Sequence, residues 1–102
     1  MNELIIFFAG ALLCNSIPHL AAGLRGEPFP SPFATPRGVG HSSASVNFYW
    51  GAGNLFVGLL LLWRRLETAE FNWGLVALVI GFVASGAYLS SHFGKVREGY
   101  DR

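Results

Sequence analysis

The sequence is poor in charge and in cysteine. Only 13% of its 102 residues are Asp, Glu, Lys or Arg, whereas a soluble domain carries roughly 25%. A chain with so few charges cannot cover a soluble surface with polar groups. The single cysteine, Cys14, excludes an internal disulfide, and no Cys-x-x-Cys pair is present to bind zinc or to run redox chemistry. A net charge of +1 gives no support for nucleic-acid binding.

Charge is absent altogether from three long apolar runs. They cover 4–24, 46–63 and 71–89, which are 21, 18 and 19 residues without Asp, Glu, Lys or Arg. At about 1.5 Å per residue, a helix over each run reaches roughly 27–31 Å, the thickness of a bilayer's hydrocarbon core. Trp63, Arg64 and Arg65 form an interfacial anchor for the short second run. The sequence therefore predicts an all-α fold, in which residues 1–102 form one membrane domain with three transmembrane helices.

The ends of the runs predict how the chain lies in the membrane. The first run follows an acidic residue, Glu3, instead of the basic segment that opens a signal peptide, so we expect it to remain as a helix. The 25–45 segment and the 90–102 tail carry five of the seven Lys and Arg residues. The positive-inside rule then places this long loop and the C-terminus in the cytoplasm.

The two connections between the runs differ in character. The 64–70 connection is short, so the second and third spans are predicted to form an antiparallel hairpin. The 25–45 segment, here called the strap, holds four of the five prolines. Because proline has no N–H to donate and keeps the preceding residue extended, we expect the strap to be polyproline-like. Ser42, Ser43 or Ser45 is expected to cap the second helix, and the 90–102 tail to lie on the surface.

The strap also carries aromatic side chains between its prolines. Two phenylalanines on a stiff segment beside a membrane favour a piece that lies on the headgroup layer or folds over the helix ends. An exposed linker is the alternative interpretation. The residues predicted to cover the helix ends or to dock a partner are Phe29, Pro30, Pro32 and Phe33.

Polar side chains interrupt the apolar runs near their middles. A side-chain amide in hydrocarbon costs several kcal/mol unless it is paired. Asn15 and Asn54 lie at matching depths, so we expect them to face protein and to bond each other. Asn47, Gly51, Asn54 and Gly58 recur at helical spacing on one face of the second run. Small and polar residues in such a stripe are typical of contacts between membrane helices.

More polar groups gather in the half of the membrane nearest the strap. Pro18 is predicted to bend the first helix and to free the Cys14 carbonyl, and His19 follows on the face of Asn15. His92 lies in the same half, close to the end of the third run. We therefore predict a polar pocket, or set of helix contacts, that opens toward the strap. Its members are Asn15, Ser16, Pro18, His19, Asn47, Asn54, Ser85 and Tyr88.

The pocket is compatible with several functions. In the favoured one, its members hold helices together in a non-catalytic accessory or structural subunit of a larger membrane complex or homo-oligomer. In a second, His19 and His92 hold haem or a metal ion, although no spacing motif supports this. A third is a small oligomeric transporter or channel, which would lack an intramembrane carboxylate for proton relay. An enzyme with His19 as its base would lack a carboxylate to orient the imidazole and a nucleophile motif.

Three short motifs resemble those of a family of small bacterial integral membrane proteins without a characterised function. They read N-S-x-P-H, F-P-x-P-F and N-x-x-W-G, with a glycine-serine stretch before the last, and cover roughly the first 60 residues. The matching positions are Asn15, Ser16, Pro18 and His19; Phe29, Pro30, Pro32 and Phe33; Gly38 to Ser43; Asn47, Trp50 and Gly51. The resemblance implies a multi-pass protein of the bacterial inner membrane. It implies no activity, cofactor or partner beyond the lipid bilayer and other membrane subunits or copies of the chain.

Overall fold

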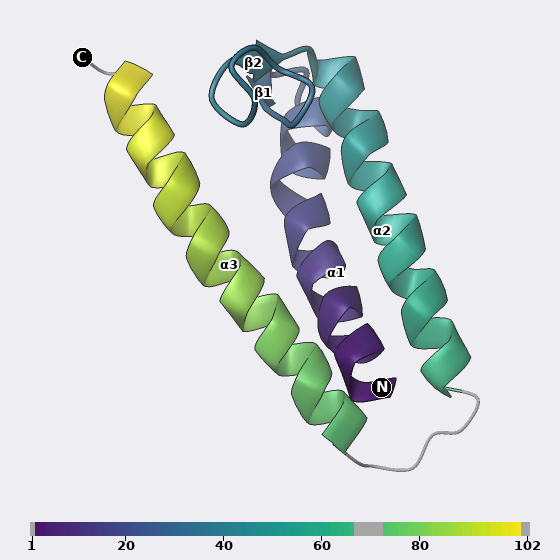
Figure 1. The fold of residues 1–102 in the computed structure, drawn as a ribbon. Helices are drawn as coiled ribbons and strands as arrows, with labels where there is room; N and C mark the ends of the chain where they lie inside the picture. Colours follow the sequence, from purple (N-terminus) through teal and green to yellow (C-terminus); the bar gives the residue numbers. More distant parts are fainter. Residues whose placement is uncertain (1, 67–72, 101–102) are drawn as a thin grey trace.

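Three long helices make up most of the structure. The computed structural model describes residues 2–66 and 73–100, and its helices are α1 (Asn2–Leu24), α2 (Ala44–Leu66) and α3 (Trp73–Tyr100). Each helix is long and apolar enough to cross a membrane. They lie along one long direction, with the strap over the end where α1 ends and α2 begins (Figure 1). The helical fold and the three candidate spans agree with the prediction.

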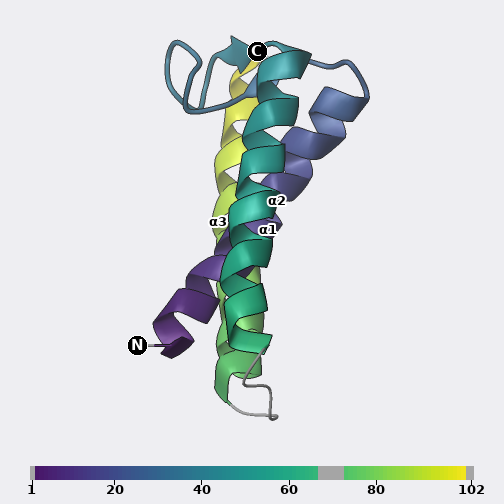
Figure 2. The same cartoon turned by 90° about the vertical axis from the view of Figure 1, so that its right-hand side faces the viewer.

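The central helix is α1. It packs against α2 on one side and α3 on the other, while α2 and α3 make few contacts with each other. Figure 1 shows α1 between its two neighbours, and Figure 2 shows it crossing them at an angle. The predicted antiparallel relation of α2 and α3 holds, but the two helices do not pack on each other. They run in opposite directions, but the first helix occupies the space between them.

Glycines explain why both neighbours pack on α1. A Cβ placed on Gly51 of α2 would lie 2.7 Å from the backbone nitrogen of Leu20, and one on Gly81 of α3 would overlap the Phe7 carbonyl oxygen. On α1 itself, a Cβ on Gly10 would overlap the carbonyl oxygen of Leu78. Close backbone approach at small residues is the usual basis of contact between membrane helices. These glycines therefore fix α1 against each partner.

The helix ends near the strap are closed by backbone and side-chain hydrogen bonds. Gly26, with φ +72°, follows α1, and its N–H donates to the Gly23 carbonyl while the Glu27 N–H donates to the Ala22 carbonyl. This pair of bonds is a Schellman motif, whose left-handed position favours glycine. At the start of α2, the Val46 N–H donates to Ser43 Oγ at 3.2 Å. Of the three predicted serines, Ser43 is the one that caps the helix.

The third helix is longer than the predicted span. It continues to Tyr100, so residues 90–100 of the predicted surface tail are helical. The segment has no proline and includes good helix formers such as Lys95, Arg97 and Glu98. Loss of hydropathy marks where a helix leaves the bilayer, not where it ends. Within α1, the helix continues past Pro18 to Leu24. The side chains of the Arg64 and Arg65 anchor, and the connection at 67–72, lie outside the described residues.

Candidate functional site: a polar and aromatic centre beneath the strap

The strap folds back on itself and is not an extended polyproline segment. Its strands β1 (Phe29–Pro30) and β2 (His41–Ser42) pair antiparallel, with Phe29 opposite Ser42 and Pro30 opposite His41. Inside the fold, the buried hydroxyls of Ser31 and Ser42 lie 2.7 Å apart. The Gly38 N–H donates to the Ser31 carbonyl at 2.9 Å, at a backbone position with φ +68°. Hydrogen bonds between distant strap residues thus override the local preference of the prolines.

The fully buried side chain of Asn47 joins the strap to the helices. Its Nδ2 lies 2.9 Å from the carbonyl oxygen of Phe29, 3.3 Å from that of Ser42 and 3.1 Å from that of Ser43. Its Oδ1 lies 2.7 Å from Nδ1 of His19 on α1. One amide near the start of α2 therefore connects α1, α2 and both strands of the strap.

These contacts fix the proton on His19. Carbonyl oxygens only accept hydrogen bonds, so the Asn47 nitrogen faces them and its oxygen faces the imidazole. His19 Nδ1 must then carry a hydrogen and donate it to Asn47. The imidazole is only 2% exposed and lies edge-on to the rings of Phe29, Trp50 and Phe93, with centroids 5.6, 6.4 and 6.1 Å away. His19 is thus held by one polar partner inside an aromatic enclosure.

Deeper in the bundle, a second amide pair joins α1 to α2. Asn15 Nδ2 donates to Asn54 Oδ1 at 3.0 Å, and Asn54 Nδ2 donates to the Trp50 carbonyl at 2.8 Å. Two serines bond to backbone carbonyls: Ser16 Oγ to Leu13 at 2.6 Å, within α1, and Ser85 Oγ on α3 to Ala11 at 3.2 Å. These polar groups satisfy one another inside the chain, as hydrocarbon surroundings require.

The third helix reaches the strap through His92. Its Nε2 lies 2.7 Å from the Gly38 carbonyl oxygen, so the ring nitrogen donates. Tyr88 stacks on the His92 ring with centroids 6.0 Å apart and an 8° angle between the planes. Unlike the buried His19, Tyr88 is 67% exposed and borders the pocket instead of filling it. The strap is therefore fastened to α1 and α2 through Asn47 and to α3 through His92.

The predicted cover residues divide between inside and outside. Pro30 is buried and Phe29 is half-buried, with its ring 4.7 Å from that of Phe93 between centroids. Pro32 and Phe33 are exposed, although the Phe33 ring also meets Trp50 edge-on at 5.3 Å. Phe29 and Pro30 therefore form the inner surface of the strap, and Phe33 lies at its edge.

A cavity of about 150 Å³ remains beneath the strap. Trp50 and His19 both line it, and the buried Trp50 Nε1 has no hydrogen-bond partner among residues 2–66 and 73–100. A water molecule occupies roughly 30 Å³ in the liquid, so the space suits a few waters, one of which can accept the hydrogen of Trp50 Nε1. Pockets for larger ligands measure roughly 300–1,000 Å³.

The haem or metal site predicted at His19 and His92 stays a prediction. The cavity that both histidines line is smaller than the usual pocket for a large ligand, and each ring makes one hydrogen bond through one of its two nitrogens. The part of the chain that the structure describes contains no group of three or more His, Cys, Asp or Glu side chains placed to bind a metal ion. The hydrogen bonds of this centre pair buried polar side chains of α1 and α2.

Sequence reasoning missed three members of this centre. Ser31 and Phe93 have no signal of their own, since each acquires its role only when the strap closes on α1 and α3. Trp50 appears in the sequence only as part of the N-x-x-W-G motif. Its spacing of three residues from Asn47 places it on the same side of α2, which is the signal that identifies it.

The fold is a three-helix bundle whose helices are long and apolar enough to span a membrane, with a folded strap over one end. Comparison with known proteins adds no family: no protein-family model, curated protein or solved structure matches the chain. The resemblance to small bacterial membrane proteins therefore depends on the three motifs alone.

Proposed function

We propose that this chain is a non-catalytic accessory subunit of a membrane complex, which acts through its outer helix faces. The supporting observation is a contrast between the interior of the chain, where polar groups bond to one another, and the exposed faces of its helices. The buried amides and His19 are bound to other groups of the same chain, so they serve to shape the subunit. The surface that remains for a function is the outside of α2 and α3.

The third helix is the best candidate for the contact. Only 11% of the residues in its apolar segment are buried inside the chain, against 33% for α1. Its outer side carries three small exposed residues at helical spacing, Ala84, Ala87 and Ser91. Small residues allow a partner helix to approach closely within a membrane. A membrane helix of another subunit, or α3 of a second copy, fits this side.

The proposal includes a location. The motifs favour the bacterial inner membrane, and the distribution of Lys and Arg favours a strap that faces the cytoplasm. A cysteine placed at the exposed Thr35 of the strap, in a Cys14→Ser background, tests the orientation. It should react with a membrane-impermeant maleimide in inverted membrane vesicles and stay unlabelled in intact spheroplasts. The reverse pattern would contradict the proposed orientation.

Purification in a mild detergent tests the accessory function itself. The full chain should elute with a constant set of membrane proteins or as a defined oligomer. A well-behaved monomer without partners would contradict the proposal.

Cysteine crosslinking tests whether α3 makes the contact. In the Cys14→Ser background, Ala87→Cys should give crosslinked species in native membranes, whereas Val57→Cys on the exposed side of α2 serves as the matched control. Equal crosslinking at both positions would exclude a specific α3 interface.

A further inference from the structure

A groove separates the C-terminal half of α3 from α1 and the strap. The two helices diverge toward the strap end (Figure 1). Two adjoining hollows occupy this space, one of about 370 Å³ deeper in the bundle and one of about 540 Å³ at the strap end. Phe29 and Phe93 form part of the wall of both. The hollows therefore follow one another along the same side of the molecule.

The deeper hollow is apolar. Ile17 and Pro18 of α1 face Phe82 and Leu89 of α3 across it, and no charged residue lines it. From Gly86, which also lines it, to Arg97 is 11 residues of α3. That length corresponds to roughly 16 Å of helix, about half the thickness of the hydrocarbon core. The groove thus has the length of one acyl chain in one leaflet.

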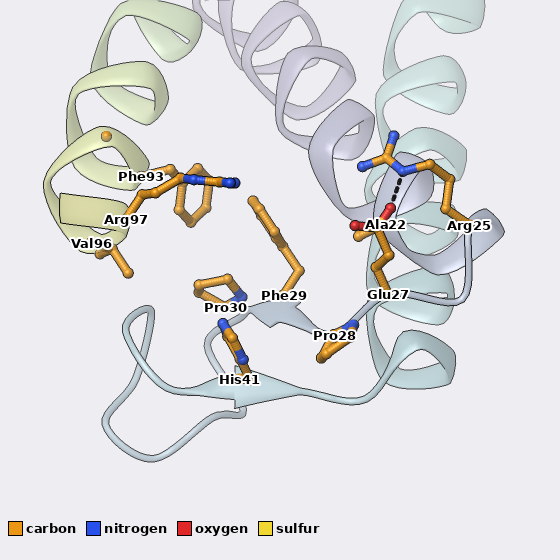
Figure 3. Close-up of a pocket in the computed structure, with 11 residues that line it drawn as sticks. Ala22, Arg25, Glu27, Pro28, Phe29, Pro30, His41, Phe93, Val96 and Arg97 are labelled. Atoms are coloured by element: carbon orange, nitrogen blue, oxygen red, sulfur yellow. Dashed lines mark hydrogen bonds and ion pairs between the residues drawn. The ribbon is translucent and has the colours of Figure 1, made fainter. Parts of the chain in front are cut away.

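The hollow at the strap end has a cationic rim. Figure 3 shows Arg97 extending from α3 into this pocket, with Phe29 and Phe93 beside it and His41 on the strap. Arg25 also lines the pocket, but its guanidinium is paired with Glu27. Glu27 lines the same pocket but pairs with Arg25, and Arg97 makes no ion pair among the residues that the structure describes. An arginine whose charge is unneutralised, at the end of an apolar groove, is complementary to an anionic head group.

We propose that this groove binds an anionic phospholipid of the surrounding bilayer, with an acyl chain in the deeper hollow and its phosphate beside Arg97. The occupant would enter sideways from the leaflet on the strap side, because the groove lies between helices that face lipid. Its position suits a lipid better than a soluble anion, since the hollow that holds Arg97 and the apolar hollow share Phe29 and Phe93 in their walls. The site is separate from the proposed accessory contact on the outer side of α3.

Two matched pairs of residues on α3 allow a controlled test. Gly94 lines the pocket and Gly99 does not, and a Cβ on either would meet no atom within 4 Å. Gly94→Trp therefore adds a large side chain at the pocket from an open Cβ position, and Gly99→Trp is its control. Arg97 lines the pocket and the exposed Lys95 does not. Arg97→Gln and Lys95→Gln remove the same charge from neighbouring positions.

The experiment is native mass spectrometry of the full chain in mild detergent with equimolar phosphatidylglycerol and phosphatidylcholine of identical acyl chains. The wild type should retain one phosphatidylglycerol in preference to phosphatidylcholine. Arg97→Gln should lower the retained fraction about fivefold, the effect of one basic residue near an anionic headgroup, and Gly94→Trp should abolish retention. Lys95→Gln and Gly99→Trp should leave it unchanged. Gel filtration of each variant verifies that it remains folded.

Several results would overturn the proposal. Equal retention of the two lipids in the wild type would exclude recognition of the anionic head group. An equal loss on Lys95→Gln would show general surface attraction instead of a site. Displacement of the lipid by soluble glycerol phosphate at similar concentration would indicate a free-anion site without a role for the acyl chain. None of these outcomes bears on whether the chain copurifies with partners, so the two proposals fail independently.

Discussion

Removal of the Asn47 side chain should loosen the strap from α1 and α2, while His92 still holds it to α3. In Asn47→Ala, the buried Nδ1–H of His19 loses its acceptor at 2.7 Å and the Phe29 carbonyl loses its donor at 2.9 Å. A buried polar group left without a partner costs about 1–3 kcal/mol, and water near the strap end reduces this for the carbonyl. We therefore expect the free energy of unfolding to fall by about 2–4 kcal/mol.

The assay is unfolding in mixed micelles by titration with sodium dodecyl sulfate, followed by tryptophan fluorescence. Trp50 is a suitable reporter because its ring meets those of His19 and Phe33. The matched control is Ser45→Ala at an exposed position in the first turn of α2, which should change the free energy by less than about 0.5 kcal/mol. Asn47→Asp keeps an acceptor for His19 and removes the donor to Phe29, so it isolates the connection to the strap.

A double-mutant cycle with His19→Ala separates the pair from its surroundings. The coupling free energy between His19 and Asn47 should be at least about 1 kcal/mol, because the two residues are in direct contact. A loss below about 0.5 kcal/mol in Asn47→Ala, or additive effects in the cycle, would refute the reasoning that this amide holds the subunit together.

The remaining predictions use the same titration. Gly81→Ala should lower the free energy of unfolding by more than about 2 kcal/mol, because its Cβ would overlap the Phe7 carbonyl oxygen. A loss as small as that of Gly99→Ala, at an open position, would contradict the α1–α3 contact. Gly26→Ala should cost about 1–2 kcal/mol, since φ is +72° there; no loss would argue against the Schellman motif. Ser43→Ala should cost about 1 kcal/mol as a lost N-cap, and Ser43→Asp should restore it.

The sequence was sufficient to predict the three long apolar helices and one contact face. Charge-free runs of bilayer length have few folded alternatives, and helical periodicity determines which residues share a side. The stripe of Asn47, Gly51, Asn54 and Gly58 is buried in the structure, because an unpaired amide in lipid costs too much. The same argument joins Asn15 to Asn54, which lie at matching depths and are hydrogen-bonded.

The sequence could not predict which helix lies between the other two. A short connection indicates that two helices run antiparallel, but it does not exclude a third helix between them. What decides the order is how closely backbones approach at Gly10, Gly51 and Gly81. Those distances depend on surfaces of separate helices, which no local pattern in the sequence specifies.

The fold of the strap depends on contacts of still longer range. Its prolines favour an extended chain locally, yet Asn47 donates a hydrogen bond to the Phe29 carbonyl across 18 residues, and His92 donates one to the Gly38 carbonyl across 54. For the same reason, the contacts of Phe93 could not be predicted from the sequence. Its partners Phe29 and His19 come from the strap and from α1.

The proton position on His19 gives the most direct test of the central claim, that buried side chains fasten helices and strap into one unit. Nitrogen-15 NMR of histidine-labelled protein in lipid bilayers distinguishes the two ring nitrogens of His19. We predict a neutral ring with its hydrogen on Nδ1, and a change in that signal in Asn47→Ala. A hydrogen on Nε2 instead, unaffected by Asn47→Ala, would contradict the account.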